Sequence, residues 1–270
     1  MGKFSGYLMV SDLDGTLFGE GHIIPENNIK AIEYFIKNDG YFTVATGRGI
    51  VACQKLIKNL PKNAPGILFN GAVLYDFNKD GIIKSSGITS ENRKSLLKEI
   101  NRAFPEIPTV VFYKDKMYNT IINDELDRLR EIIEMKEEYM PVDCIQIPWF
   151  KALCEGPNDE LLKLEKFVKT LHYDEFDYIF SSDNLFEILQ KGVTKATALI
   201  ELTEYLNIDM KKTIAIGDYY NDLDLLKTAG YSIVPMNAPD DIKSFADKIV
   251  CDHKKGAIAD LIENFDKFIS

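Results

Sequence analysis

Short apolar runs and longer amphipathic segments take turns at the start of the chain. Residues 7–11, 41–46 and 66–70 are dominated by aliphatic and aromatic side chains, which is typical of buried strands. Between these runs, residues 23–40 and 49–60 space their apolar side chains as a helix with one buried face does. The order strand, helix, strand, helix, strand predicts a parallel sheet with helices packed on its faces.

The same alternation returns near the end of the chain. Apolar runs predict strands at residues 213–218, 231–236 and 248–251. Amphipathic segments predict helices at residues 221–230, 238–247 and 256–269. Both ends of the chain therefore predict parts of one α/β domain with a Rossmann-like parallel sheet.

The middle of the chain follows a different pattern. Residues 72–87 and 109–122 carry short polar turns between extended runs, which predicts β-hairpins. They are interspersed with predicted helices at residues 90–104 and 159–171 and with extended segments at residues 144–156 and 178–190. Hairpins and helices mixed inside a parallel α/β frame predict an inserted α+β domain.

The boundaries of the inserted domain follow from glycine positions. We expect it to span residues 83–191, so that residues 1–82 and 192–270 together form the α/β core. Gly87 and Gly192 lie near the two junctions and supply the backbone freedom that a hinge needs.

Net charge narrows the range of partners. The 270 residues carry a formal net charge of −10, and the sequence pI is about 4.9. An acidic surface repels phosphate backbones and anionic lipid heads, so we expect no nucleic acid and no membrane as partner. No stretch approaches the roughly 18 apolar residues of a membrane span, and the N-terminus lacks a signal peptide's apolar core.

Cysteine usage points to a reducing compartment. The four cysteines form no C-x-x-C pair and have no histidine at metal-binding spacing, so we expect free thiols. With the charge and hydropathy, this predicts a soluble cytoplasmic protein that is a monomer or a weak homo-oligomer. The cysteines are Cys53, Cys144, Cys154 and Cys251.

Polar residues of catalytic type gather where the predicted core strands end. Because ligands bind beyond the carboxyl ends of parallel strands, we expect these residues to share one edge of the sheet. Lys195 lies just past the inserted domain and supplies a cation. The strand-end residues are Asp12 and Asp14, then Thr46, Gly47 and Arg48, then Asn70 and Gly71, and finally Asp218, Asn221 and Asp222.

Each of these residues also has an ordinary structural interpretation, as a turn former, a helix cap or an exposed lysine. An EF-hand loop is excluded, because Gly15 is at the fourth position of a loop that begins with Asp12, whereas an EF-hand needs glycine at the sixth position. Residues 47–52 read G-R-G-I-V-A and fit a dinucleotide-binding fingerprint. Asn70 and Gly71 stand where that fingerprint calls for an acidic residue on the next strand, which disfavours it.

Paired carboxylates beside a lysine suit phosphoryl chemistry. Asp12 can attack phosphorus and form an aspartyl-phosphate, and Asp14 can protonate the leaving oxygen and later activate water. A Mg²⁺ ion between Asp12 and Asp218 would offset the repulsion between the carboxylates. Lys195 adds a second cation, and Thr46 with nearby backbone amides can bind a phosphoryl oxygen.

Five motifs in sequence order carry a family resemblance. S-D-L-D-G-T-L at 11–17, T-G-R at 46–48, F-N-G-A at 69–72, the lysine of G-V-T-K and G-D-Y-Y-N-D at 217–222 resemble the haloacid dehalogenase superfamily. The closest likeness is to its Cof-type phosphatases, whose large α/β cap of the C2B type is inserted between the third core strand and the lysine motif. The resemblance spans essentially the whole chain.

The resemblance implies roles for individual residues. Asp12 would be the nucleophile and a metal ligand, and Asp14 the acid/base that also ligates through its backbone carbonyl. Asp218 would be the second metal carboxylate, with Asn221 and Asp222 supporting the metal and the lysine. The predicted metal ligands are Asp12, Asp14, Asp218 and Asp222; the predicted phosphate or substrate binders are Thr46, Gly47, Arg48, Asn70, Gly71, Lys195, Asn221 and Asn237.

One motif departs from the family pattern. The usual M-G-N-A appears here as Pro235, Met236, Asn237 and Ala238, without the glycine. Asn237 is still expected on the phosphate side. Arg48 is expected either to face substrate or to be structural.

The predicted function is therefore a Mg²⁺-dependent phosphatase of small phosphorylated metabolites, such as sugar phosphates. Two alternatives stay open: a phosphomutase-like phosphoryl transferase and a non-catalytic sensor of a phosphorylated metabolite. We expect the cap to select the substrate, and core packing to be the main role of its aromatic residues. The cap candidates are Tyr113, Lys114, Lys116, Trp149, Phe150 and Lys151.

Overall fold

The computed structural model describes residues 2–113, 116–121 and 137–269, which group into two compact units. The first unit comprises Met1–Gly47, Leu56–Ile83 and Thr194–Ser270, and the second comprises Arg48–Lys55 and Lys84–Val193. The segment Arg48–Lys55 thus groups with the second unit although it follows a core strand in sequence. The assignment of these units as catalytic core and substrate-selecting cap stays a prediction.

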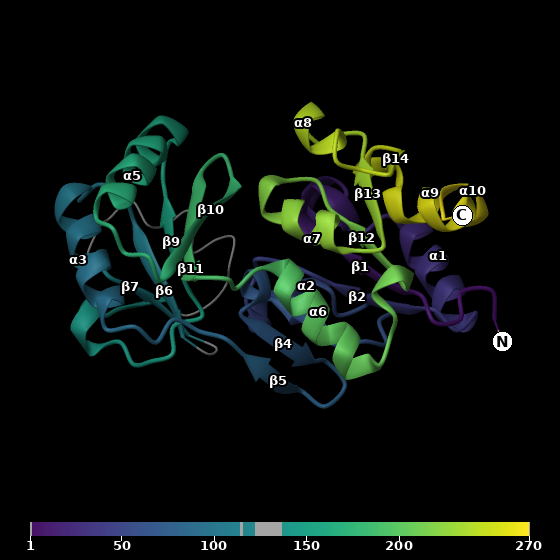
Figure 1. Cartoon of the computed structure of the whole chain (residues 1–270), viewed down its shortest axis with the longest axis horizontal. Coiled ribbons are helices and arrows are strands. Elements are labelled where there is room, and N and C mark those ends of the chain that lie inside the picture. The colour runs from purple at the N-terminus through teal and green to yellow at the C-terminus, as the bar shows by residue number, and fades with distance from the viewer. Residues whose placement is uncertain (1, 114–115, 122–136, 270) are drawn as a thin grey trace. The chain divides into compact units, whose positions relative to one another are not determined.

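A parallel sheet forms the centre of the first unit (Figure 1). Its strand order is β14-β13-β12-β1-β2, and every adjacent pair is parallel. The α/β fold class that the sequence predicts is therefore confirmed. The strands are β1 (Leu8–Ser11), β2 (Tyr41–Val44), β12 (Thr213–Ile216), β13 (Tyr231–Pro235) and β14 (Lys248–Val250).

Helices follow the strands of this unit as the periodicity predicts. Leu8 and Val10 of β1 share a buried cluster with Leu199 and Leu202 of α6 (Lys195–Leu206) and with Leu225 of α7 (Leu223–Thr228), because alternate strand residues face the same side. The remaining helices of this unit are α1 (Glu26–Lys37), α8 (Asp240–Lys243), α9 (Ala257–Glu263) and α10 (Phe265–Phe268).

The third predicted strand does not extend the parallel sheet as a full strand. β3 (Gly66–Leu68) meets it through one parallel bridge, Ala45 to Ile67, and pairs antiparallel with β4 (Val73–Asp76). Residues 69–71 all have positive φ, which ends β3 and reverses the chain. The resulting small sheet has the order β3-β4-β5, with β5 at Gly81–Ser85.

The second unit contains a six-stranded sheet, against which α3 (Asn92–Ala103) and α5 (Asn158–Thr170) pack (Figure 1). Its order is β10-β11-β9-β6-β7-β8, antiparallel except between β7 and β8. Both helices share one buried cluster with alternate strand residues such as Val111, Cys154 and Ile188, so they cover one face. The elements are α3 (Asn92–Ala103), β6 (Thr109–Tyr113), β7 (Lys116–Asn119), β8 (Glu137–Tyr139), β9 (Lys151–Glu155), α5 (Asn158–Thr170), β10 (Phe176–Ser182) and β11 (Leu185–Gln190).

Several predicted elements are shorter than their apolar patterns. The extended segment at 178–190 is an antiparallel pair, β10 and β11, that reverses at Asp183 and Asn184. The helix predicted at 256–269 is divided at Asn264, and α2 covers only Ile50–Leu56. Among the helices in the described part of the chain, none has the length and apolarity required to cross a bilayer.

Candidate active site

The site is centred where β1 and β12 end side by side. β1 pairs with β12 in parallel up to Ser11 and Ile216, and the backbone N–H of Asp12 donates to the Ile216 carbonyl at 2.8 Å. Asp12 therefore leaves the sheet close to the residues that follow β12, including Asp218. The Asp12 side chain is buried, whereas Asp218 is half-buried.

Lys195 joins two of the carboxylates. Its Nζ lies 2.6 Å from Oδ1 of Asp12 and 2.6 Å from Oδ1 of Asp222, and all three side chains are buried. Lys195 is the first residue of α6, whose start is fixed by Thr194 and Thr197, which cap each other's backbone N–H groups. A helix terminus thus holds the ammonium group against the sheet edge.

Asp222 supports this arrangement from the other side. Its Oδ2 accepts hydrogen bonds from the backbone N–H groups of Asp218 and Tyr219, at 3.0 and 3.2 Å. With Oδ1 bound to Lys195, both oxygens of Asp222 are engaged within the protein. Asp222 therefore positions the lysine and the turn that carries Asp218.

The turn after β1 contributes Thr16, which the sequence analysis did not select as a site residue. Thr16 is buried, and its hydroxyl donates to Oδ1 of Asp218 at 2.7 Å. Gly15 has φ +77°, and a Cβ at this position would fall on the carboxyl group of Asp218. Only glycine permits this close approach, so the G-T pair that follows Asp14 orients Asp218.

Three carboxylates of the site could hold a divalent cation. Oxygens of Asp12, Asp218 and Asp222 all lie within 4.8 Å of one another. Carboxylate oxygens are the ligands that Mg²⁺ prefers, so the donor set fits that ion chemically. Because Asp222 already binds Lys195 and two backbone amides, Asp12 and Asp218 are the carboxylates better placed to ligate.

Burial and mutual repulsion shape the titration of the cluster. Burial, together with repulsion from the neighbouring carboxylates, raises the pKa of Asp12 well above its usual range although Lys195 opposes this. Burial and the nearby Asp222 raise the pKa of Asp218 to about 7. Burial alone would lower the pKa of Lys195, but the carboxylates of Asp12 and Asp222 outweigh burial and raise it, so the lysine is charged.

These shifts predict how the stability of the metal-free protein depends on pH. The folded-state pKa of Asp218 lies above the unfolded value of about 4. The stabilisation by its bound proton is therefore fully present below that value and is lost as the pH rises through about 7. We subtract the thermal midpoint of Asp218→Asn from that of the wild type. We expect this difference to decrease as the pH rises from about 4 to about 7.

Thermal unfolding in a chelator at a series of pH values measures this difference. The subtraction is needed because carboxyls with a lowered pKa, such as Asp76, contribute the opposite slope. Parallel curves for the wild type and Asp218→Asn would contradict the assignment of the raised pKa to Asp218.

Five of the predicted phosphate or substrate binders of the first unit are joined by short contacts. The backbone N–H of Asn70 donates to the Thr46 carbonyl at 3.0 Å, and Nδ2 of Asn221 donates to Oδ1 of Asn70 at 3.2 Å. Gly47 lies against the Asn70 side chain, and Gly71, with φ +104°, lies against the backbone at Thr194. These contacts join the ends of β2 and β3 to the start of α6.

Asn237 and Arg48 have other surroundings. Nδ2 of Asn237 donates to the Gly15 carbonyl at 2.8 Å, and its Oδ1 accepts from the backbone N–H of His253 at 3.1 Å. The asparagine thus braces the turn after β1 even without the family's preceding glycine. Arg48 belongs to the second unit, and its role stays a prediction.

Two histidines that sequence reasoning did not select lie beside this turn. Nδ1 of His22 is 3.1 Å from Oδ1 of Asp14, and both side chains are about half exposed. Nδ1 of His253 lies 2.6 Å from the Phe18 carbonyl. The sequence offered one hint: the chain has three histidines, and His22 follows Asp14 by eight positions.

The cap candidates divide into buried and exposed residues. Trp149 and Phe150 are buried, as expected for core packing. Lys151 is also buried, and its Nζ lies 2.7 Å from Oε2 of Glu187, whose other carboxylate oxygen accepts from the Ser181 hydroxyl at 2.6 Å. Tyr113 is half-buried, Lys116 is exposed, and Lys114 lies outside the described residues.

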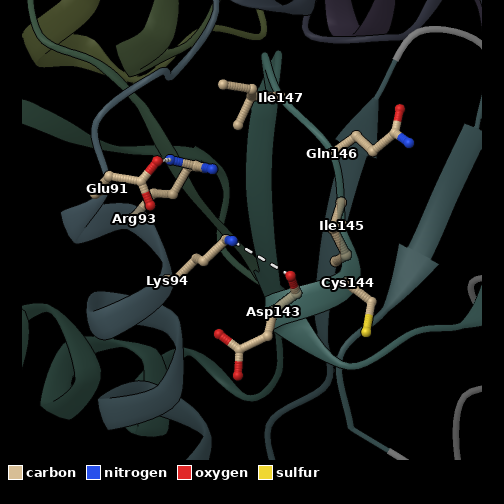
Figure 2. A pocket seen from close by; sticks show the side chains of 8 residues that line it. All are labelled: Glu91, Arg93, Lys94, Asp143, Cys144, Ile145, Gln146 and Ile147. Atoms are coloured by element: carbon tan, nitrogen blue, oxygen red, sulfur yellow. Dashed lines mark hydrogen bonds and ion pairs between the residues drawn. The ribbon is translucent and has the colours of Figure 1, made fainter.

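A groove of about 450 Å³ lies in the second unit near the start of α3 (Figure 2). Lys94 reaches across it and donates to the Asp143 carbonyl at 3.3 Å, while the Asp143 carboxylate lies 2.6 Å from Lys98. The described lining of the groove includes two acidic and two basic side chains, whereas the site of the first unit is a cluster of carboxylates. It is lined by Glu91, Arg93, Lys94, Asp143, Cys144, Ile145, Gln146 and Ile147.

Comparison with known proteins identifies the family. A family model of haloacid dehalogenase-like hydrolases matches residues 9–262, so the chain belongs to that family and the predicted resemblance is confirmed. A relative from Serratia proteamaculans named HMP-PP phosphatase is 25% identical over 88% of this chain and 86% of its own length. A 5-amino-6-(5-phospho-D-ribitylamino)uracil phosphatase of Bacillus subtilis is 24% identical over 96% of this chain and 95% of its own.

A solved structure agrees with the fold. A Thermotoga maritima protein superposes with a TM-score of 0.82 at 24% identity, covering 96% of this chain and 97% of its own. With the family match and relatives that are named phosphatases, this chain is a hydrolase of the phosphatase class, as the sequence predicts.

Proposed function

We propose that the protein is a Mg²⁺-dependent phosphomonoesterase that acts on small phosphorylated metabolites through an aspartyl-phosphate on Asp12. The observation that carries the proposal is the buried contact of Asp12 with Lys195, directly beside Asp218. A carboxylate held by a lysine next to a second carboxylate offers a nucleophile and two oxygens for a cation.

In the first step, Asp12 attacks the phosphorus atom of the ester. Lys195 binds Oδ1, which leaves Oδ2 to form the new bond to phosphorus while the bond from phosphorus to the ester oxygen breaks. Asp14 donates a proton to the departing oxygen, which leaves as an alcohol. Thr46 and the backbone near Asn70 are assigned to the remaining phosphoryl oxygens.

In the second step, water replaces Asp12 on phosphorus. Asp14, now ionised, takes a proton from the attacking water, and the bond between phosphorus and Oδ2 of Asp12 breaks to release phosphate. When bound, Mg²⁺ held by Asp12 and Asp218, with the Asp14 backbone carbonyl, supplies positive charge to the phosphoryl oxygens. Lys195 contributes a fixed charge at the same place throughout.

The substrate class rests on chemistry and on relatives. The name of the Bacillus relative refers to a phosphate ester of a small metabolite, a ribitylaminouracil, and the Serratia relative is also named a phosphatase, which supports a small organic phosphate here. Sugar phosphates fit the same chemistry. A phosphomutase-like transferase would use the same first step and pass the phosphoryl group to a second hydroxyl instead of water.

Phosphate release from a panel of phosphorylated metabolites tests the proposal. We expect at least one ester to be hydrolysed with Mg²⁺, and the activity to vanish in excess chelator and return when Mg²⁺ is restored. Adding sugar acceptors to the same assay separates hydrolysis from transfer, because transfer yields a second phosphate ester in place of free phosphate. Metabolite binding without turnover across the panel would favour a sensor and contradict the proposal.

A further inference from the structure

We propose that His22 is a positioning residue that orients the carboxyl group of Asp14, the acid/base of the proposed reaction. Its Nδ1 lies 3.1 Å from Oδ1 of Asp14, within hydrogen-bonding distance. Because an ionised carboxylate only accepts, the imidazole must present a proton at Nδ1 when Asp14 is ionised. The inference rests on the proposed function, which gives Asp14 its role.

The segment that carries His22 is held firmly at its base. The Gly19 N–H donates to the Ile23 carbonyl at 2.8 Å, which closes a tight loop around His22. Phe18 is buried, its carbonyl is bound by His253, and its ring meets the His22 ring edge-on at 5.8 Å. His22 therefore reaches Asp14 from a braced loop and packs against a fixed aromatic ring.

The backbone of this loop is unusual. His22 has φ +58° and follows Gly21, which has φ +65°, so two consecutive residues are left-handed. Non-glycine residues rarely adopt this conformation, and such residues concentrate at functional sites. The left-handed turn is the local cause that brings the imidazole to the carboxylate.

Asp14 must be oriented to transfer a proton in the proposed reaction. Its side chain is 44% exposed and lies on a helical turn over Leu13–Leu17, where its own ψ of 122° is not helical. Proton transfer needs one carboxyl oxygen aligned with the leaving group, and the contact of Oδ1 with His22 favours the rotamer that the structure shows. Because His22 contacts Oδ1, we assign the transferred proton to Oδ2.

Two substitutions separate positioning from folding. His22→Asn keeps an N–H donor one bond from Cγ, as Nδ1 is, and asparagine tolerates a left-handed backbone. His22→Gly tolerates the same backbone but removes the side chain. His172→Gly is the matched control, because His172 also has a positive φ of +54°, is exposed, and lies in the other unit.

The readout is kcat/KM with Mg²⁺ for phenyl phosphate and for 2,4-dinitrophenyl phosphate. Phenolate is a poor leaving group that needs the proton from Asp14, whereas dinitrophenolate leaves without it. We expect His22→Gly to lose about tenfold on phenyl phosphate and no more than about twofold on the dinitrophenyl ester. We expect His22→Asn to recover most of the loss and His172→Gly to match the wild type.

Other outcomes overturn the inference in distinguishable ways. Equal losses of kcat/KM on both esters would show a general structural role, and no loss on either ester would show that His22 does not act through Asp14. If kcat/KM for phenyl phosphate is no higher in His22→Asn than in His22→Gly, a hydrogen bond donated by Nδ1 is excluded as the cause. A wild type that hydrolyses neither aryl ester nor any metabolite of the panel would overturn the proposed function, and this inference with it.

Discussion

Asp12→Asn should abolish turnover while leaving the protein folded. The amide that replaces the carboxylate is not a nucleophile toward phosphorus, so the aspartyl-phosphate cannot form. We expect kcat for phenyl phosphate to fall by about 10⁴-fold or more, as when other enzymes lose their nucleophile. Steady-state phosphate release with saturating Mg²⁺ measures the effect.

The fold should tolerate this change because the Asp12 carboxylate is costly to the metal-free protein. Its pKa is raised mainly by burial, which means that the ionised form is disfavoured in the folded state. Asp222 still neutralises Lys195 in the variant. We therefore expect a thermal midpoint in chelator equal to or above that of the wild type.

Asp76→Asn is the matched control for Asp12→Asn. Asp76 also ends a strand of the first unit, but its carboxylate accepts from the backbone N–H groups of Asn78 and Lys79. We expect its kcat to stay within about twofold of the wild type, since it lies outside the predicted site. Retained turnover by Asp12→Asn would remove the proposed mechanism, and equal losses in both variants would point to a general effect on folding.

The sequence was sufficient to predict the sheet and the meeting of its strand ends. Parallel strands bring their carboxyl ends to one edge, so Asp12 after β1 and Asp218 after β12 had to lie near each other. Lys195 could be placed there from the family motif. The structure adds the hydrogen-bond partners of individual oxygens, such as Lys195 at Oδ1 of Asp12, which depend on side-chain rotamers that no periodicity encodes.

What escaped prediction depends on the backbone rather than on hydrophobic pattern. β3 stops at Leu68 because residues 69–71 all have positive φ, and two of them are not glycine. The same kind of turn at Gly21 and His22 brings the imidazole to Asp14. Tertiary contacts determine which non-glycine residues adopt a left-handed backbone, so the pattern of apolar residues does not predict them.

Lys195→Met should have the largest effect on stability. The ammonium group is fully buried between Asp12 and Asp222, at 2.6 Å from each. Removing it leaves two buried carboxylates without their cation, and breaking a buried ion pair in this way costs about 3–5 kcal/mol. We expect the free energy of unfolding from urea denaturation in chelator to fall by about that amount, with loss of phosphatase activity.

A matched control and a double variant distinguish burial of charge from loss of packing. Lys30→Met removes a lysine whose ion pair with Glu26 is exposed on α1, and its stability should stay close to that of the wild type. Adding Asp12→Asn to Lys195→Met removes one of the stranded carboxylates, so the double variant should be more stable than Lys195→Met alone.

If the double variant is no more stable than Lys195→Met, the loss must come from packing around the lysine stem instead of from unpaired charge. The cation of Lys195 would then not be what allows the Asp12 carboxylate to be buried at the end of β1. Recovery in the double variant would instead show that Lys195 stabilises the fold by neutralising Asp12. The proposed mechanism uses the same contact, because it keeps Lys195 on Oδ1 of Asp12 during attack on phosphorus.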